Sequence, residues 1–244
     1  MTLYVLGPGF GESQVFSLPD GRWMVVDCCR HRKQVLPALV LRHFDVSRID
    51  LLVITHPDLD HVEGAEELFR DFTIDRTWRY PGAASIRDLL SGDLLNGAAS
   101  THSGWSGVIE LLRKDAQESL LADLRVVKVA HHGSKNAFCP EAWKLHARSS
   151  KVDVAVLTPF RKPPPPHPET LDHLRPYVDK LVITAGGSSS GDAFGVARQS
   201  GWVAHPDAAI HGSGVAIQVD ATGSCMTTVG TSARQFGHAA HGDP

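Results

Sequence analysis

The chain carries a dense run of side chains that can bind a metal ion, His56-Pro57-Asp58-Leu59-Asp60-His61. Divalent cations such as Zn²⁺ and Mn²⁺ take imidazole nitrogens and carboxylate oxygens as ligands. Four of the six residues offer such groups, namely His56, Asp58, Asp60 and His61. A tight loop can direct the first two toward one ion and the last two toward a second, as in two-metal hydrolases. The run therefore predicts a metal centre that holds one or two ions.

A purely structural reading of the same run is also available. Asp60 is followed three residues later by Glu63, which is close to a capping-box spacing, so Asp60 could be only the N-cap of a helix. Pro57-Asp58 could be only a turn. Each of these readings explains one carboxylate, whereas a cluster of ligand-type residues needs a joint explanation. We therefore favour metal binding.

Two further histidine motifs follow predicted strands. His131-His132 follows a strand over residues 124–130, and His167 follows the Pro-rich run 163–166. Side chains alternate along a strand, so one member of the pair could bind metal while the other contacts substrate or packs inside, and the sequence leaves open which. We assign His131 to the metal, and we name Asp60, His132 and His167 as candidate catalytic residues, because imidazoles and carboxylates can exchange protons near neutral pH.

The elements that must position these residues can be predicted from hydropathy. Residues 49–55 form a nearly continuous apolar run, typical of a strand buried on both faces, and this run ends where the His/Asp cluster begins. Before it, strands are predicted over 3–6, 14–18 and 23–28 and a helix over 33–44. After it, helices are predicted over 62–72, 108–121, 141–147 and 169–177, and strands over 74–80, 124–130, 152–157, 181–184, 214–219 and 225–229. The candidate ligands therefore lie at the carboxyl ends of strands.

Composition limits the remaining classes. With 244 residues, 42% of them hydrophobic, we expect one folded domain over 1–230 and a flexible tail over 231–244. The formal charge of −3 provides no global attraction to nucleic acid or membrane, although a local basic groove remains compatible with it. The four cysteines have no C-x-x-C spacing, and the N-terminus has no signal-peptide pattern. We expect a cytoplasmic protein that does not enter membranes.

The motifs resemble those of a known superfamily. Residues 55–64 resemble the H-x-[HD]-x-D-H signature of the metallo-β-lactamase superfamily, in the H-x-D-x-D-H form of competence-protein (ComEC-like) metallo-hydrolases. Residues 127–135 and 167–171 resemble two later motifs of that branch, in the same order. The resemblance implies an α/β fold of the αββα sandwich type, with the metal site at one edge of the two sheets. It also implies that His167 and one of His131 and His132 line the site with the first cluster.

The chain departs from the ComEC-like pattern between residues 80 and 124. That branch normally has a Gly-Asp there whose carboxylate bridges two metals. Ser91-Gly92-Asp93 is the candidate in this chain, but it follows a segment that reads better as a short helix than as a strand. We take Asp93 as a candidate metal ligand, with an ordinary loop acid as the alternative. The number of ions is therefore left open.

The sequence thus predicts a metal-dependent hydrolase, and the resemblance favours phosphodiester bonds of a nucleic acid or a small molecule. The aspartate at position 58, where lactamase-like members have histidine, shifts preference toward Mn²⁺ while Zn²⁺ also fits. The acidic net charge counts against a nuclease. Two alternatives stay open. One is a catalytically impaired binding or regulatory module, and the other is a hydrolase of small esters or thioesters.

Overall fold

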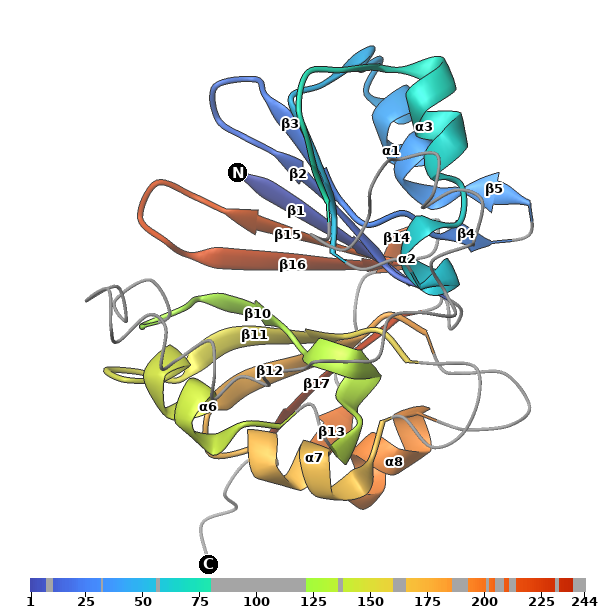
Figure 1. Cartoon of the computed structure of the whole chain (residues 1–244). Coiled ribbons are helices and arrows are strands. Elements are labelled where there is room, and N and C mark those ends of the chain that lie inside the picture. The colour runs from blue at the N-terminus through green and yellow to red at the C-terminus, as the bar shows by residue number, and fades with distance from the viewer. Residues whose placement is uncertain are drawn as a thin grey trace, which may run out of the picture.

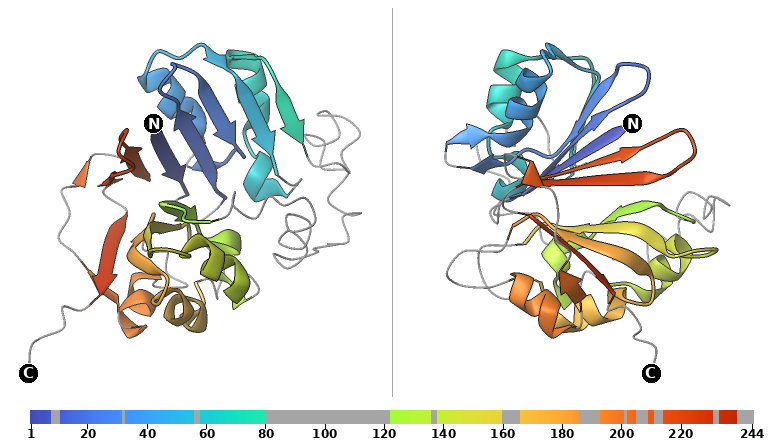
Figure 2. Two further views of the ribbon diagram at one scale, coloured as in Figure 1. Left: turned by 90° about the vertical axis from the view of Figure 1, so that its left-hand side faces the viewer. Right: turned by 180° about the vertical axis from the view of Figure 1, so that it is seen from behind.

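The structure of the protein is a computed structural model that describes residues 1–7, 11–31, 33–55, 58–79, 122–135, 138–159, 166–185, 193–200, 202–204, 209–210, 214–230 and 233–238. Two sheets stack face to face, and helices cover the outer face of each (Figures 1 and 2). This is the predicted αββα sandwich, and the mixed α/β fold expected from the sequence is confirmed. Among the described residues no helix has the length and apolar character needed to cross a membrane.

The first sheet has the strand order β14-β16-β15-β1-β2-β3-β7-β9. Its strands are β1 (Thr2–Leu6), β2 (Ser13–Ser17), β3 (Trp23–Val26), β7 (Leu51–Ile54), β9 (Thr77–Arg79), β14 (Ala209–Ile210), β15 (Val215–Val219) and β16 (Cys225–Gly230). The opening strands β1, β2 and β3 pair antiparallel, as hairpins do, whereas β3, β7 and β9 run parallel. The carboxyl ends of β3 and β7 therefore meet at one edge of this sheet.

The second sheet has the order β10-β11-β12-β17-β13. Its strands are β10 (Val126–Lys128), β11 (Val152–Leu157), β12 (Val178–Ile183), β13 (Trp202–Ala204) and β17 (Arg234–His238). The first three are parallel, so their carboxyl ends also share an edge. Two short pairs lie outside these sheets, β4 (Arg30–His31) with β5 (Gln34–Val35) and β6 (Arg48–Ile49) with β8 (Thr73–Ile74).

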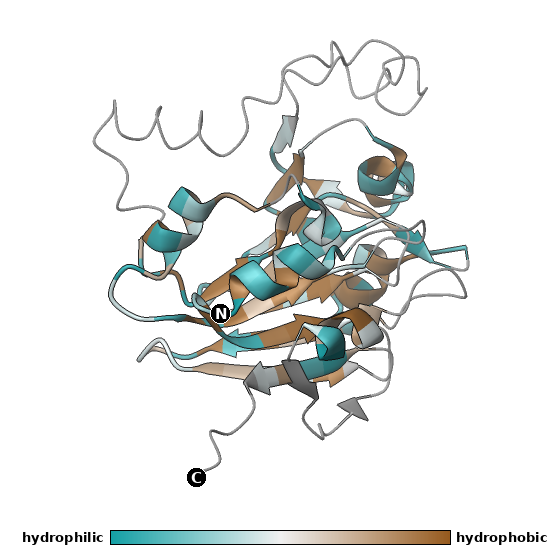
Figure 3. Ribbon diagram, turned by 90° about the horizontal axis from the view of Figure 1, so that it is seen from below, coloured by the Kyte–Doolittle hydropathy of each residue, from teal (hydrophilic) through white to brown (hydrophobic). Residues whose placement is uncertain are grey.

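The apolar side chains explain the layers. On β11, Val154 and Val156 belong to the core between the sheets, whereas Ala155 and Leu157 belong to the core under the outer helices. This strand is thus buried on both faces, which is why its sequence is a continuous apolar run. Figure 3 shows the same layering, with hydrophobic strands inside and hydrophilic residues on the helices.

Helices cover the outer faces of the sheets. The first sheet carries α1 (Leu36–His43) and α3 (Ala65–Asp71), and α2 (Leu59–Val62) lies at the sheet edge. The second sheet carries α6 (Pro140–His146), α7 (Pro168–Leu174) and α8 (Ala193–Gln199), and the 3-10 turn η2 (Ala130–Gly133) follows β10. The helix predicted over 62–72 is divided, because Gly64 adopts a left-handed φ of 98° where an added Cβ would lie 2.5 Å from Val35 Cγ2.

Part of the predicted tail over 231–244 is wrong. Residues Arg234–His238 form β17, which lies between β12 and β13 in the second sheet. Phe236 is fully buried there, so this strand contributes to the core under the outer helices. The short, Gly-interrupted sequence gave no strand signal because its pairing partners are distant in the chain. Residues 239–244 lie outside the described residues.

Candidate metal centre

The candidate site lies where strand ends from both sheets meet. Asp27 directly follows β3, and α2 follows β7 after a short connection. From the second sheet, η2 follows β10 and Thr158 directly follows β11. Functional residues commonly gather outside the carboxyl ends of parallel strands, where loops project from a rigid scaffold.

Three ligand-type side chains converge at this edge. The ligand atoms of Asp60, His61 and His132 all lie within 4.8 Å of one another. Asp60 Oδ2 is 3.3 Å from His61 Nε2 and 3.6 Å from His132 Nε2. Both imidazoles are buried, with 5% and 7% of their residues' surface exposed. The two Nε2 atoms and the carboxylate oxygen thus face one point, which is a nitrogen and oxygen donor set suited to a divalent cation.

Each imidazole is held through its other ring nitrogen. His61 Nδ1 lies 2.8 Å from Asp27 Oδ2, and His132 Nδ1 lies 2.7 Å from the Thr158 carbonyl oxygen. A carbonyl can only accept a hydrogen bond, so His132 Nδ1 carries a proton and Nε2 is the ring nitrogen that faces Asp60. Metal-binding histidines are usually oriented by a carboxylate or a carbonyl in this manner. The residues present therefore fit a divalent metal ion.

Asp27 is itself fixed by the chain around it. Its Oδ1 accepts the Thr55 N–H at 2.8 Å, and its Oδ2 accepts the Thr55 hydroxyl at 2.7 Å. Its backbone adopts a left-handed φ of 58°. Asp27 falls inside the strand predicted over 23–28 and was not among the predicted site residues. The signal available in the sequence was a carboxylate near the end of an apolar run.

The short helix α2 is tied to the first sheet by its backbone. The Glu12 N–H donates to the Asp60 carbonyl at 3.1 Å, and the Cys28 N–H donates to the His61 carbonyl at 2.7 Å. Gly11, which precedes Glu12 in the chain, has a φ of 78°, and a Cβ added there would lie 2.6 Å from the Asp60 carbonyl oxygen. Glycine is thus required for this close approach.

The charges of the cluster favour cation binding. Burial raises the pKa of Asp60, but hydrogen bonds from His132 and His61 outweigh it and hold that pKa well below its usual range. Burial lowers the pKa of His61, yet hydrogen bonds and charges of Asp27 and Asp60 raise it to about 10. Without a metal, His61 is therefore protonated at neutral pH. A cation that binds its Nε2 must displace that proton.

The structure brings together some of the predicted site residues. Asp60 and His61 lie in the cluster with His132, whose ring nitrogen could serve as a ligand. The predicted catalytic role of His132 stays a prediction. The alternation argument for the histidine pair was wrong, because η2 is a 3-10 turn and His132 has a φ of 55°. His56 and Asp93 lie outside the described residues, as does the side chain of His131.

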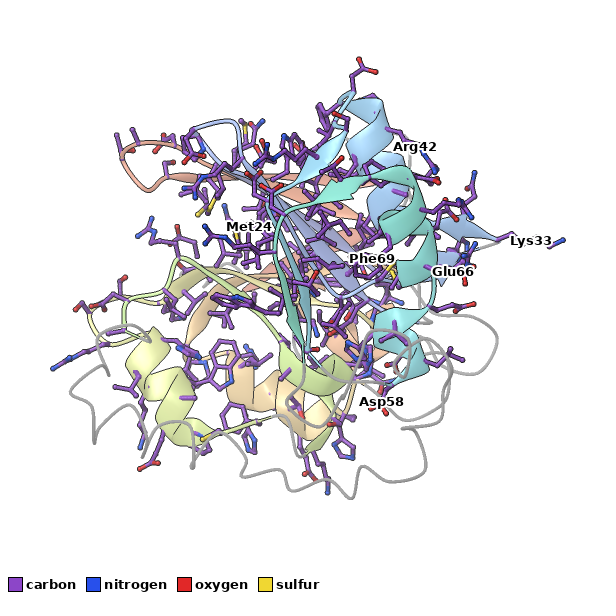
Figure 4. The ribbon with its side chains drawn as sticks, turned by 45° about the horizontal axis from the view of Figure 1, so that its top comes forward. Met24, Lys33, Arg42, Asp58, Glu66 and Phe69 are labelled. Atoms are coloured by element: carbon purple, nitrogen blue, oxygen red, sulfur yellow. The ribbon has the colours of Figure 1, made fainter. Side chains whose placement is uncertain are left out.

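Asp58 and His167 lie beside the cluster and are not part of it. Asp58 is the exposed N-cap residue of α2, and Figure 4 labels it at the end of that helix. Asp60 is inside α2, so its reading as an N-cap is wrong. The His167 N–H donates to the Gly133 carbonyl at 2.8 Å, which places this residue next to His132 in space. His167 Nδ1 is buried without a hydrogen-bond partner in the described part of the chain.

Comparison with known proteins agrees with this geometry. The family model of the metallo-beta-lactamase superfamily matches residues 7–100, a segment that includes the His56 to His61 run. This match covers less than half of the chain, and the αββα sandwich extends the likeness to the second sheet. No curated protein matches the chain. The fold is that of the metallo-beta-lactamase superfamily, whose members are typically hydrolytic metalloenzymes that bind divalent ions.

Proposed function

We propose that the chain is a metal-dependent hydrolase that cleaves phosphodiester bonds and uses Zn²⁺ or Mn²⁺. The observation that carries the proposal is the convergence of Asp60 Oδ2 with the Nε2 atoms of His61 and His132. Both imidazoles are preoriented through Nδ1, so little rearrangement is needed to form the site.

The residues have separate roles in this proposal. Asp60, His61 and His132 hold the ion, and Asp27 with the Thr158 carbonyl keeps the two rings aimed at it. When bound, such an ion polarises the scissile phosphoryl group and supplies hydroxide near neutral pH. The buried position of the two imidazoles limits water around the reacting atoms. One ion accounts for the described ligands, and a second would need His56, Asp58 or Asp93.

His167 is the proposed proton donor to the leaving oxygen. It precedes α7 and is tied to Gly133, one residue from His132, while its Nδ1 lacks a partner among described residues. His167→Gln should lower the turnover of substrates with basic leaving groups far more than the turnover of substrates that release p-nitrophenolate, because p-nitrophenolate leaves without accepting a proton. Equal losses for both kinds of substrate would remove this role.

The choice of a phosphodiester rests on the motif likeness to the ComEC-like branch and on one basic residue, Lys135, which lies three residues after His132 in the sequence. Lys135 follows η2 by two residues and forms an exposed ion pair with Glu169 at 3.0 Å. An exposed pair of this kind contributes little stability, so a phosphate oxygen can replace the carboxylate at small cost. The proposal therefore assigns Lys135 to the non-bridging oxygens of the substrate.

The test measures metal content and turnover in the same preparations. Protein purified without chelator is analysed for metals and assayed with bis(p-nitrophenyl) phosphate and p-nitrophenyl acetate. Asp60→Ala and His61→Ala should lose both metal and activity, whereas Asp20→Asn, a change in an exposed turn, should keep both. A wild-type protein that stays metal-free after dialysis against Zn²⁺ and Mn²⁺ would refute the proposal.

The outcomes also separate the rival functions. Bound metal with turnover of the acetate alone would indicate an ester hydrolase. Bound metal with neither substrate cleaved, and no difference between wild type and the two ligand variants, would indicate a binding module. Cleavage of the phosphodiester that depends on Asp60 and His61 supports the proposed function.

A further inference from the structure

A second buried polar cluster lies directly behind the candidate metal centre. Glu12 is 6% exposed, and its carboxylate accepts hydrogen bonds from the Lys128 ammonium and the Thr158 hydroxyl. Its Oε2 also lies 3.6 Å from His132 Nδ1. Among the described residues, the polar partners of this carboxylate all follow, or end, a strand of the second sheet.

Glu12 itself lies at the edge of the first sheet. It directly precedes β2, and its N–H donates to the Asp60 carbonyl at 3.1 Å. Glu12 therefore contacts both segments that supply the candidate ligands. Its backbone contacts the segment that carries Asp60, and its side chain contacts the segment that carries His132. Thr158 completes the connection, because its hydroxyl donates a hydrogen bond to the Glu12 carboxylate while its carbonyl accepts a hydrogen bond from His132 Nδ1.

A contribution to stability alone does not explain a carboxylate in this position. Burying an ion pair costs desolvation that often exceeds its attraction, and apolar residues of similar size commonly stabilise a fold as well. The Glu12 carboxylate instead pairs with the Lys128 ammonium and lies against the turn that holds a metal ligand.

We propose that Glu12 is a positioning residue of the metal centre, which fixes His132 from the second sheet relative to Asp60 from the first. The inference rests on the proposed function in that the ligand to be bound is a divalent ion. It predicts that Glu12 controls the geometry of the ligand set, and that it does so through Thr158 and Lys128 without touching the ion.

The experiment compares Glu12→Gln with a matched control in another buried contact between the sheets. Glutamine keeps the shape and can still accept from Thr158, but it leaves the Lys128 ammonium without its countercharge. The control is Thr184→Val, because the Thr184 hydroxyl donates to the Gly7 carbonyl across the same two layers, and neither residue belongs to the ligand trio of Asp60, His61 and His132. Thermal denaturation of the metal-free proteins first establishes that each variant is folded.

Metal affinity is then measured by competition of Zn²⁺ and of Mn²⁺ with a chromophoric chelator. Glu12→Gln is expected to bind about 10–100-fold more weakly than wild type, the usual effect of losing an outer partner of a metal site. Thr184→Val is expected to lose stability and keep the wild-type affinity. A folded Glu12→Gln protein with wild-type affinity would overturn the inference.

A second variant and a second readout keep the test decisive. If Glu12→Gln does not fold, Thr158→Val replaces it, since this change removes the hydroxyl bonded to Glu12 and leaves the carbonyl bonded to His132. If wild type binds no metal, the proposed function fails, and the ¹⁵N shifts of the His132 ring decide this inference separately. Wild type should show one set of His132 ring signals, assigned with His132→Gln, and Glu12→Gln should show shifted or doubled signals because the ring is no longer held in one position. Identical spectra would overturn it.

Discussion

The two histidines of the ligand trio are held by different kinds of partner. His61, from the first sheet, is held by the carboxylate of Asp27, whereas His132, from the second sheet, is held by the backbone carbonyl of Thr158. A carboxylate places a negative charge beside the ring, and a substitution can remove it. A backbone carbonyl fixes the direction of the hydrogen bond, and no side-chain substitution removes it. The comparison teaches that His61 is tuned by electrostatics and His132 by backbone geometry, with Glu12 securing the latter.

The largest expected effect comes from removing the ligand that both histidines face. Asp60→Ala should weaken metal binding by more than about 100-fold, beyond the range for an outer partner, because it deletes the shared carboxylate oxygen. Isothermal titration with Zn²⁺ and Mn²⁺ measures this. Retention of full affinity would show that the ion binds elsewhere, and the comparison between the two histidines would lose its basis.

The next effect isolates the electrostatic side of the comparison. Asp27→Asn should weaken metal binding by about 10–100-fold, since the amide can still accept from Thr55 but offers His61 no charge. In the metal-free protein the pKa of His61 should fall, because Asp27 is one of the two groups that raise it. An NMR titration of the His61 ring measures that change. An unaltered pKa would contradict the assignment of Asp27.

The pH dependence of metal binding sharpens the same point. Asp27 and Asp60 overcome the opposing effect of burial and raise the pKa of His61 to about 10, so a metal ion must compete with a proton at neutral pH. Apparent affinity should rise about tenfold per pH unit between pH 7 and 9. Titrations in non-coordinating buffers test this prediction, and a flat profile would contradict it.

The free energy of unfolding of the metal-free protein should fall as the pH rises, whereas metal affinity rises. The pKa of His61 rises from an ordinary 6.5 to about 10 on folding, so the protonated ring stabilises the fold fully below pH 6.5. That contribution is lost as the pH rises through about 10. Denaturant unfolding from pH 6 to 10 measures the loss, and the Asp27→Asn protein, whose shift should be smaller, provides the comparison.

The smallest effect on metal affinity is expected at Thr55, which hydrogen-bonds Asp27 and not a metal ligand. Thr55→Val removes the hydroxyl that bonds Asp27 at 2.7 Å but keeps the backbone N–H bond at 2.8 Å. Asp27 should therefore stay in place, and metal affinity should fall by no more than about threefold, a fraction of the effect of losing a direct outer partner. A loss as large as that of Asp27→Asn would show that the hydroxyl, and not the strand, orients the carboxylate.

The sequence predicted the parts of this site that are local. The apolar run before the His/Asp cluster became β7, and Asp60 and His61 lie in the cluster because adjacent residues on a short helix stay close together. Glu12 and Asp27 were missed because their roles depend on partners far along the chain: Asp27 lies 34 residues from His61, and Glu12 lies 116 residues from Lys128. No local periodicity reports such pairs.

Backbone conformation accounts for other differences. His132 has a left-handed φ in a 3-10 turn, which no alternation of a strand anticipates. The helix α8 follows the Gly/Ser-rich sequence 186–191 and was not predicted, because its own short sequence has a weak amphipathic pattern. The sandwich could still be predicted, since it depends on the strong apolar runs of β7 and β11 and on the resemblance of three motifs.

The division of the ligand set between two sheets has a consequence for how the protein matures. Asp60 and His61 come from the half of the chain that carries the superfamily match, and His132 comes from the other half. Contacts between residues distant in sequence cost more chain entropy to form than local contacts do. The site is complete only when the two layers have docked. An ion that needs all three side chains would therefore bind only to molecules in which both layers are in place.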